Sequence, residues 1–297
     1  MTDPTPAEID RIARALGWRP ARWHNVTDRG PHANAAHWLV ENGDRQAFVK
    51  VPRADLPGEW LRREHQTLVA LNASGADFAP EVVGWSDDGA WPLLALEDLS
   101  AATWPPPWAA ASVGVVLETL RQVESTPPPS HLQPIEIDPS VGWASVESDS
   151  EPFLRLGLCS AGWLETSLPV LTAAGARAPL AGDSLIHLDV RSDNLCFPSP
   201  RRAILVDWNH ATIANPALDV AFWLPSLESE GGPSPDQILP EAPELAAWVA
   251  GFFCSRAGLP PIPDAPHVRP LQVAQAGPAL AWAARALDLP PPSSEGG

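Results

Sequence analysis

The residues whose types and spacing could do chemistry lie mostly between positions 187 and 207. The run His187-Leu188-Asp189-Val190-Arg191-Ser192-Asp193-Asn194 is followed by a short, largely apolar stretch and then by Asp207. A loop carboxylate such as that of Asp189 can accept a proton from a substrate hydroxyl group. Taken singly, each of these acids is also what an ordinary solvated loop contains, so the arrangement of the whole group decides its interpretation.

The stretch between Asn194 and Asp207 predicts a β-hairpin. Two strands, Leu195–Phe197 and Ala203–Val206, are joined by a turn, and the first residue of one strand is expected opposite the last residue of the other. Because paired antiparallel strands meet at their ends, Asn194 and Asp207 emerge together. Amide and carboxylate oxygens are ligands that Mg²⁺ takes, while water and substrate phosphates complete its octahedron. The hairpin therefore predicts a magnesium site.

A second candidate pair involves the one lysine of the chain. Lys50 is the single lysine among 19 basic residues and lies near the end of an expected strand. Residues 58–72 have helical periodicity, and Glu64 falls on their apolar stripe, where an unpaired carboxylate would be costly. An ion pair between Lys50 and Glu64 would fix the ammonium and leave it donors for phosphate oxygens. The alternative is that Glu64 lies at the edge of the stripe and Lys50 is exposed.

The elements that must position these residues differ between the two parts of the chain. Before residue 98 the sequence predicts a helix over residues 5–17, the helix over 58–72, and strands at Arg22–Thr27, on either side of Asn42-Gly43, at Val82–Trp85 and at Pro92–Glu97. After residue 98 it predicts helices at Trp108–Glu124, Glu151–Ala174, Ala217–Glu228, Pro243–Arg256 and Leu271–Leu287. We therefore expect two lobes, residues 1–98 and 99–297, and no internal repeat.

Composition removes several classes of function. The 36 acidic residues give a net charge of -17, which disfavours nucleic acid as a partner. No apolar run is long enough for a membrane span and the N-terminus lacks a signal sequence, so no membrane partner and a cytoplasmic location are expected. The three cysteines have no disulfide-like or metal-like spacing, which favours a reducing compartment. A GC-rich genome would also account for the scarcity of lysine.

Taken in order, these features match the signature of kinases. A lysine on the third strand, a glutamate on the next helix, the pattern H-x-D-x-x-x-x-N and an aspartate after a hairpin occur in that sequence. The chain resembles the aminoglycoside phosphotransferase and choline kinase-like family, of the actinobacterial antibiotic phosphotransferase type, over nearly its whole length. The resemblance implies an α+β, bilobal protein-kinase-like fold. It has an N-lobe with a five-stranded antiparallel sheet and one main helix, and a mostly helical C-lobe with the catalytic hairpin.

The resemblance also implies roles for individual residues. Asp189 would be the catalytic base, and Arg191 would contact the γ-phosphate. Nucleotide binding would use Lys50, Glu64, Gly30, Asn34 and the backbone of Glu97 and Leu99, with Asn194 and Asp207 as Mg²⁺ ligands and His187 and Asp219 as structural supports. The sequence departs from the family pattern at Leu188, where glycine is common, and at Arg191-Ser192-Asp193, where His-Pro-Gly is common before the asparagine. The loop at residues 28–34 holds a single glycine rather than the G-x-G-x-x-G of protein kinases.

The implied reaction moves the γ-phosphoryl group of ATP or GTP to a hydroxyl group, with Mg²⁺. Residues 100–180 and 215–290 would build the acceptor pocket, to which we assign Asp193, Trp163, Glu228 and Glu230; Trp104, Trp108 and Trp143 could also stack a ring. The expected acceptor is an antibiotic, either aminoglycoside-like, a basic peptide or a nucleoside. The alternatives are a metabolic kinase acting on choline, a sugar or homoserine, and a non-catalytic binding protein. The protein is expected to be a monomer or a homodimer.

Overall fold

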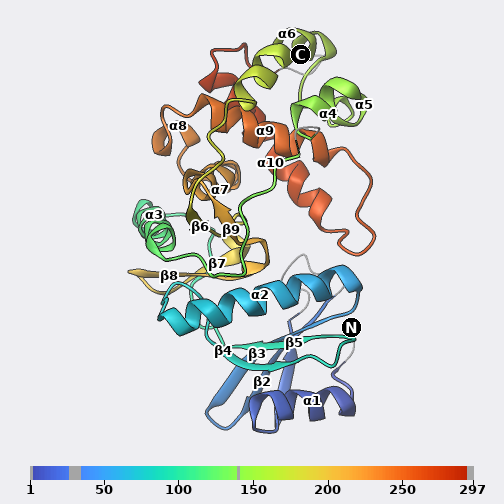
Figure 1. The fold of residues 1–297 in the computed structure, drawn as a ribbon, viewed down its shortest axis with the longest axis vertical. Helices are drawn as coiled ribbons and strands as arrows, with labels where there is room; N and C mark the ends of the chain where they lie inside the picture. Colours follow the sequence, from blue (N-terminus) through green and yellow to red (C-terminus); the bar gives the residue numbers. More distant parts are fainter. Residues whose placement is uncertain (1–2, 27–34, 139–140, 293–297) are drawn as a thin grey trace.

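The computed structural model describes residues 3–26, 35–138 and 141–292 and shows two lobes stacked along the long axis of the molecule (Figure 1). The lower lobe holds a five-stranded antiparallel sheet, and the upper lobe is mostly helical. The predicted α+β bilobal fold is confirmed, whereas the boundary at residue 98 stays a prediction. Within the described part of the chain, no helix combines the length and apolar character needed to cross a membrane.

The sheet of the lower lobe contains the five strands that the sequence predicts. They are β1 (Arg22–Asn25), β2 (Ala35–Asn42), β3 (Arg45–Pro52), β4 (Val82–Ser86) and β5 (Leu93–Leu96), in the order β1-β2-β3-β5-β4. Asn42 pairs with Arg45, so the turn between β2 and β3 is Gly43-Asp44, one residue later than predicted. Gly43 has a φ of 62°, which glycine adopts without strain.

Alternation along β5 divides the sheet into two apolar faces. Leu93 and Ala95 pack on one face with Ile12 of α1 (Pro6–Leu16). A capping box forms at the start of α1, because the Glu8 N–H donates to Thr5 Oγ1 at 3.3 Å and the Thr5 N–H donates to Glu8 Oε2 at 2.7 Å. The side chains of Leu94 and Leu96 point to the other face. Helix α1 thus covers the side of the sheet that is remote from the upper lobe (Figure 1).

The main helix of the lower lobe, α2 (Asp55–Ser74), joins the two lobes. Its stripe of Leu61, Leu68 and Leu71 is buried, as the helical periodicity predicts. This stripe belongs to the same apolar cluster as Trp208 and the helices of the upper lobe. The Leu205 N–H donates to the Phe78 carbonyl at 2.8 Å, which ties the chain after α2 to the hairpin of the upper lobe. Helix α2 therefore lies between the sheet and that hairpin.

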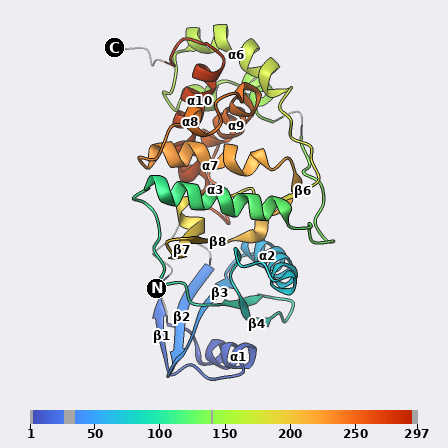
Figure 2. The same cartoon turned by 90° about the vertical axis from the view of Figure 1, so that its left-hand side faces the viewer.

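The upper lobe is built from helices that surround short strands. The helices are α3 (Ala110–Ser125), α4 (Trp143–Ser148), α5 (Glu151–Leu154), α6 (Ala161–Gly175), α7 (Ala217–Ser229), α8 (Pro235–Ile238), α9 (Pro243–Ala257) and α10 (Val268–Ala286). Turned by 90°, the molecule shows α3 and α7 crossing the lobe between the hairpin and the helices at its far end (Figure 2). The single helix predicted over Glu151–Ala174 is wrong: it is two helices, because Gly157 has a φ of 66° and Ser160 begins a new helix.

The hairpin at the base of the upper lobe forms as predicted, with a shifted register. Strand β7 (Leu195–Ser199) pairs with β8 (Arg202–Leu205), and Leu195 lies opposite Leu205 rather than Val206. The Val206 N–H instead donates to the Asn194 carbonyl at 2.8 Å, so the ladder continues one residue beyond the strands. Two short strands missed by the sequence, β6 (Ser184–Ile186) and β9 (Thr212–Ala214), pair behind the hairpin. Three residues are too few to show a periodic pattern.

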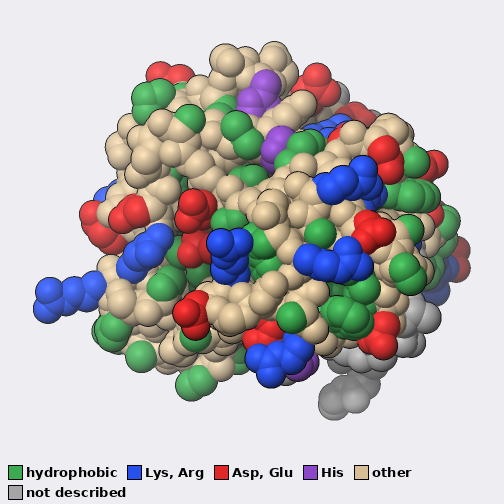
Figure 3. All heavy atoms as spheres, turned by 90° about the horizontal axis from the view of Figure 1, so that it is seen from below, with side chains coloured by type: hydrophobic (Ala, Val, Ile, Leu, Met, Phe, Trp, Pro, Cys, Tyr) green, Lys and Arg blue, Asp and Glu red, His purple; other side chains and the backbone are tan. Residues whose placement is uncertain are grey.

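The surface of the lower lobe carries mixed charge. Seen from below, acidic and basic side chains are interspersed over this end of the molecule (Figure 3). The acidic excess of the whole chain therefore does not collect into one field on this face, and single apolar side chains between the charges are ordinary for a protein surface.

Gly84 tests how closely α1 packs on the sheet. A Cβ atom at Gly84 would lie 2.7 Å from the Ala15 carbonyl oxygen, so we expect Gly84→Ala to lower the free energy of unfolding by about 1–3 kcal/mol. Gly114→Ala is the control, because a Cβ there meets no atom within 4 Å and alanine stabilises a helix by about 0.5–1 kcal/mol. Urea denaturation measures both. Equal effects of the two changes would contradict the close packing of α1.

Candidate active site

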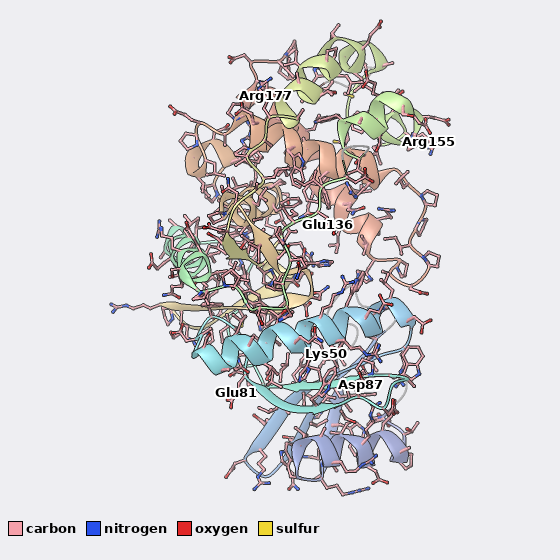
Figure 4. All side chains as sticks on the ribbon, in the orientation of Figure 1. Lys50, Glu81, Asp87, Glu136, Arg155 and Arg177 are labelled. Carbon is pink, nitrogen blue, oxygen red and sulfur yellow. The ribbon has the colours of Figure 1, made fainter. Side chains whose placement is uncertain are left out.

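The lone lysine lies between two carboxylates that come from different parts of the chain. Lys50 Nζ donates to Glu64 Oε1 at 2.8 Å and Oε2 at 3.0 Å, and also to the Asp207 carboxylate. Lys50 is only 9% exposed and Glu64 only 3%. In the side-chain view, Lys50 lies between the sheet and α2 (Figure 4). The predicted pair of Lys50 and Glu64 is confirmed, and Asp207 completes a cluster that spans both lobes.

Burial and charge act against each other in this cluster. Burial disfavours the Lys50 ammonium, but Asp207 and Glu64 outweigh that effect and raise the pKa of Lys50 above its usual value. Burial raises the pKa of Glu64 to about 7, against the lowering effect of Lys50. Two carboxylates thus share one ammonium, which leaves this end of the cleft with an excess of negative charge. Such a site attracts a further cation.

The loop that carries Asp189 is held by Asp219 of α7. The His187 N–H donates to Asp219 Oδ2 at 2.9 Å, and the Leu188 N–H donates to Oδ1 at 2.6 Å. Leu188 has a φ of 64°, a left-handed conformation that is costly for a branched side chain. The two bonds from Asp219 hold the backbone in this conformation. Burial raises the pKa of Asp219 to about 7, and the two N–H donors act in the opposite direction.

His187 is locked as a neutral imidazole beneath the same loop. Its Nε2 lies 2.8 Å from the Val206 carbonyl oxygen, and the Asp189 N–H lies 3.2 Å from Nδ1. These partners require a proton on Nε2 and a lone pair on Nδ1. Burial lowers the pKa of His187 to about 4. The ring therefore connects the Asp189 loop to Val206, the residue before Asp207.

The carboxylate of Asp189 is oriented by two neighbours. Asn194 Nδ2 donates to Asp189 Oδ2 at 2.8 Å and to the Asp189 carbonyl at 2.9 Å. Arg191 donates to the other carboxylate oxygen of Asp189 and binds Asp193 through Nε at 2.9 Å. The two carboxylates outweigh burial and raise the pKa of Arg191. Arg191 thus bridges Asp189 and Asp193, and the Asp193 carboxylate holds the guanidinium in place.

The donor set fits a magnesium ion that is bound together with phosphate. Because Asn194 Nδ2 is engaged with Asp189, the Asn194 amide oxygen is the atom left for a cation. Asp207, with a φ of 63°, directly follows the Val206 N–H that bonds Asn194. Among the described residues, no three His, Cys, Asp or Glu side chains converge as a metal site. Two hard oxygen ligands with room for phosphate and water are what Mg²⁺ takes in phosphoryl-transfer sites.

The segment after β5 offers two free backbone groups. The Glu97 N–H donates to the Glu81 carbonyl at 3.0 Å, and the Leu99 carbonyl accepts from the Ala102 N–H at 3.0 Å. Within the described chain, the Glu97 carbonyl and the Leu99 N–H form no hydrogen bond. One acceptor and one donor, two residues apart, suit the edge of a nucleobase. The other predicted nucleotide contacts, Gly30 and Asn34, lie outside the described residues.

One cavity of about 570 Å³ connects the charged cluster with the upper lobe. Lys50, Asp189 and Asp207 line one end of it, and side chains of α7, α9 and α10 line the other. Its volume is within the range of small-molecule sites. In the view of Figure 4, Glu136 lies on the side of the upper lobe, above α2. Glu136 also lines this cavity, which joins the two lobes.

Most of the acceptor residues predicted from the sequence lie elsewhere. The indole of Trp163 donates to the Pro290 carbonyl at 2.8 Å and is buried. Glu228 binds Arg285, and Glu230 accepts from the Trp108 indole at 2.8 Å and from Ser192 Oγ at 2.6 Å. None of these three lines the cavity. An isolated tryptophan or glutamate in a helical segment packs or pairs more often than it binds a ligand, which is why sequence alone misplaces them.

The cavity wall contains residues that sequence reasoning missed. Trp248, Phe252 and Arg256 follow one another at intervals of four along α9 and all line the cavity, opposite Leu271 and Gln275 of α10. The i, i+4, i+8 spacing is visible in the sequence and places the three side chains on one helix face. What it lacks is any sign that this face borders a cavity rather than the core.

Fold and site together define a bilobal phosphotransferase with an ordered lysine, a candidate base and a hard-oxygen metal site. A scan of protein families supports this class: residues 25–252 match the model described as the phosphotransferase enzyme family. The chain belongs to that family of phosphotransferases. No curated protein matches the chain by sequence.

Solved structures share the fold at low sequence identity. A thermostable mutant of aminoglycoside phosphotransferase APH(4)-Ia, with AMP-PNP and hygromycin B, gives a TM-score of 0.61 at 14% identity, over 96% of this chain and 98% of that one. The GDP and kanamycin complex of APH(2")-IIIa gives 0.57 at 15% identity, over 93% and 94%. A putative fructosamine-3-kinase from Haemophilus somnus 129PT gives 0.53 at 14% identity, over 91% and 94%.

Asp219→Asn tests the support of the Asp189 loop. Asparagine replaces one acceptor oxygen by an NH₂ group that faces a backbone N–H, so we expect the free energy of unfolding to fall by about 1–3 kcal/mol. Asp183→Asn is the control, since Asp183 is exposed and surface changes of this kind stay within about 0.5 kcal/mol. Chemical denaturation compares the two variants. If Asp219→Asn left the free energy of unfolding unchanged, the two N–H groups would have other hydrogen-bond partners, and the proposed support by Asp219 would be wrong.

Proposed function

We propose that this protein is a Mg²⁺-dependent O-phosphotransferase that moves the γ-phosphoryl group of ATP or GTP to a hydroxyl group of a small compound, with an antibiotic as the leading substrate and resistance or self-protection as the outcome. The observation that carries the proposal is the convergence of Lys50, Glu64 and Asp207 at one end of a cavity that Asp189 also lines. The cluster unites the strand, the helix and the hairpin, as the kinase-type site requires.

Each residue then has one task. The substrate hydroxyl gives its proton to Asp189 while its oxygen forms the new bond to phosphorus, and the bond from phosphorus to the β-phosphate oxygen breaks. Lys50, held by Glu64, binds the α/β-phosphates, and Arg191 binds the γ-phosphate after turning from Asp189. Asn194 and Asp207 would hold Mg²⁺, which supplies positive charge for the phosphate oxygens. His187 and Asp219 keep the loop in place.

The donor is a purine nucleotide held by backbone groups after β5. The Glu97 carbonyl and the Leu99 N–H are the free acceptor and donor, and they would pair with the base edge. Fold relatives were solved with ADP, AMP-PNP or GDP, which supports a nucleotide donor of either purine type. The three cysteines are free and buried, which suits a protein that acts in the reducing cytoplasm.

A metabolic kinase is the second candidate for the acceptor. The fold relative described as a putative fructosamine-3-kinase supports it, because the same site would phosphorylate a sugar hydroxyl. Antibiotic and metabolic acceptors differ only in the pocket beyond Asp189. A panel of hydroxyl compounds, including aminoglycosides, nucleosides, choline and sugars, incubated with ATP or GTP and Mg²⁺, tests both by a mass gain of about 80 Da, one phosphoryl group.

Asp189→Asn tests the proposed base. The amide cannot take the hydroxyl proton, so we expect the kcat for phosphoryl transfer to fall by about 10²–10⁴-fold while nucleotide binding persists. Asp183→Asn, on the surface, serves again as the control and should keep full activity. The kcat of each variant is measured from the steady-state release of ADP or GDP, with an acceptor that the wild-type protein phosphorylates. Full activity of Asp189→Asn would overturn the assignment.

Chelation tests the metal. With EDTA in excess we expect phosphoryl transfer to stop, and to return on addition of Mg²⁺. The reason is that Asn194 and Asp207 would supply two Mg²⁺ ligands, while phosphate oxygens and water would complete the coordination sphere. Asp207→Asn removes one anionic ligand and should raise the Mg²⁺ concentration for half-maximal rate at least tenfold. Titration of Mg²⁺ at saturating nucleotide compares this variant with wild type. Turnover that persists in EDTA would exclude the metal site.

A further inference from the structure

The far end of the cavity indicates what kind of compound carries the acceptor hydroxyl. Resting on the proposed phosphotransferase function, we propose that the acceptor is a ring-bearing alcohol with a carboxylate or similar anionic oxygen, whose flat apolar ring packs on the aromatic face of α9 and whose anionic group binds Arg256. This class differs from the polycationic aminoglycosides that the acidity of the chain suggests.

The apolar part of the proposal rests on a cluster of rings. Phe222 of α7 packs edge-on against Trp248, with ring centroids 5.5 Å apart, and against Phe252, at 5.0 Å. Trp248 and Phe252 are half-buried and line the cavity, opposite Leu271 on α10. Rings fixed by edge-to-face contacts present a rigid apolar wall. A flat ring buries more apolar surface against such a wall than a hydroxylated, charged saccharide does.

The charged part rests on Arg256, one turn beyond Phe252 on the same face of α9. Its guanidinium lies 4.1 Å from the centroid of the Phe252 ring and lines the cavity. NH1 donates to the Phe252 carbonyl at 3.2 Å and to Ser255 Oγ at 3.5 Å, and no carboxylate of the described residues forms an ion pair with Arg256. Burial and Arg269 lower the pKa of Arg256, while Asp138 acts in the other direction. A half-buried guanidinium without an ion pair is stabilised by a ligand carboxylate.

A buried amide completes this end of the cavity. Gln275 lies on the α10 face that lines the cavity, and it is only 7% exposed. Its amide atoms are not among the enclosed side-chain polar atoms that lack a hydrogen-bond partner, so the amide is open to the cavity. A ligand oxygen or hydroxyl group in the cavity can therefore form hydrogen bonds with it. Arg256 and Gln275 therefore offer donors from two helices to one ligand.

The acidic residues of the cavity do not reverse this preference. Glu136 and Asp138 line it from the segment before α4, where both are exposed to water. Charges in water are screened, whereas a partly buried charge acts at a lower effective dielectric constant. Asp264 also lines the cavity and is partly buried, but the acidic residue whose charge acts on Arg256 is the exposed Asp138. A ligand ammonium placed beside Arg256 would be repelled by its guanidinium.

A matched set of small alcohols tests the proposal. The probes are 4-(hydroxymethyl)benzoate, benzyl alcohol and 4-(aminomethyl)benzyl alcohol, which share ring and hydroxyl group and differ in charge, and 6-hydroxyhexanoate, which keeps the charge and lacks the ring. Saturation-transfer NMR with the nucleotide-bound protein ranks their dissociation constants. We expect the benzoate to bind at least tenfold more tightly than the amine, and more tightly than the acyclic acid.

Variants assign the ranking to the cavity. Arg256→Gln should bring the benzoate and the amine to within about threefold of each other, and Arg256→Lys should restore part of the preference. Arg155→Gln, which removes an exposed guanidinium directly after α5, should leave the preference unchanged. Tighter binding of the amine, or a preference that survives Arg256→Gln in a protein with an unchanged thermal unfolding midpoint, would overturn the proposal.

The same samples separate this proposal from the proposed function. Phosphoryl transfer is followed in parallel, by mass, with each probe and with kanamycin. Preferential binding of the benzoate without phosphorylation of any compound supports the proposed class of ligand, a ring with an anionic group, and contradicts the proposed phosphoryl transfer. Phosphorylation of kanamycin together with preferential binding of the amine supports the phosphotransferase and contradicts the acceptor class.

Discussion

The ion cluster of Lys50, Glu64 and Asp207 is the constraint on which the rest of the site depends. Lys50 of β3, Glu64 of α2 and Asp207, two residues after β8, must meet within hydrogen-bond distance in a largely dry place. Breaking such a cluster by removing one partner leaves an uncompensated buried charge, at a cost of several kcal/mol. The relative position of the two lobes therefore depends on the pairing of the Lys50 ammonium with the two carboxylates, at the place where phosphates would bind.

The loop of Asp189 shows how a fixed backbone substitutes for a flexible residue. Leu188, between His187 and Asp189, adopts a left-handed conformation that glycine reaches without strain. Asp219 and His187 hold the loop from two sides, through bonds to three consecutive N–H groups. The strain at Leu188 is thus borne by buried hydrogen bonds, and the leucine side chain is free to form part of the cavity wall.

Much of this arrangement could be predicted from local patterns. The position of Glu64 on an apolar stripe required a buried partner, and the hairpin required Asn194 and Asp207 to meet. The contact of Lys50 with Asp207 joins residues far apart in sequence and follows from no local period. The break at Gly157 was hidden within an apolar, helix-like stretch. The face of Trp248, Phe252 and Arg256 had the right spacing, but only tertiary packing distinguishes a cavity wall from a core.

The apolar stripe of α2 has a consequence for how the molecule folds. Leu61, Leu68 and Leu71 share one continuous core with the upper lobe, while the cluster beneath α1 is small. A fragment that ended at residue 98 would expose this stripe to water and lose the bond between Leu205 and Phe78. The lower lobe is thus a functional unit that cannot be an autonomous one. Unfolding of either lobe would therefore expose apolar side chains of the other, which couples the stability of the two lobes.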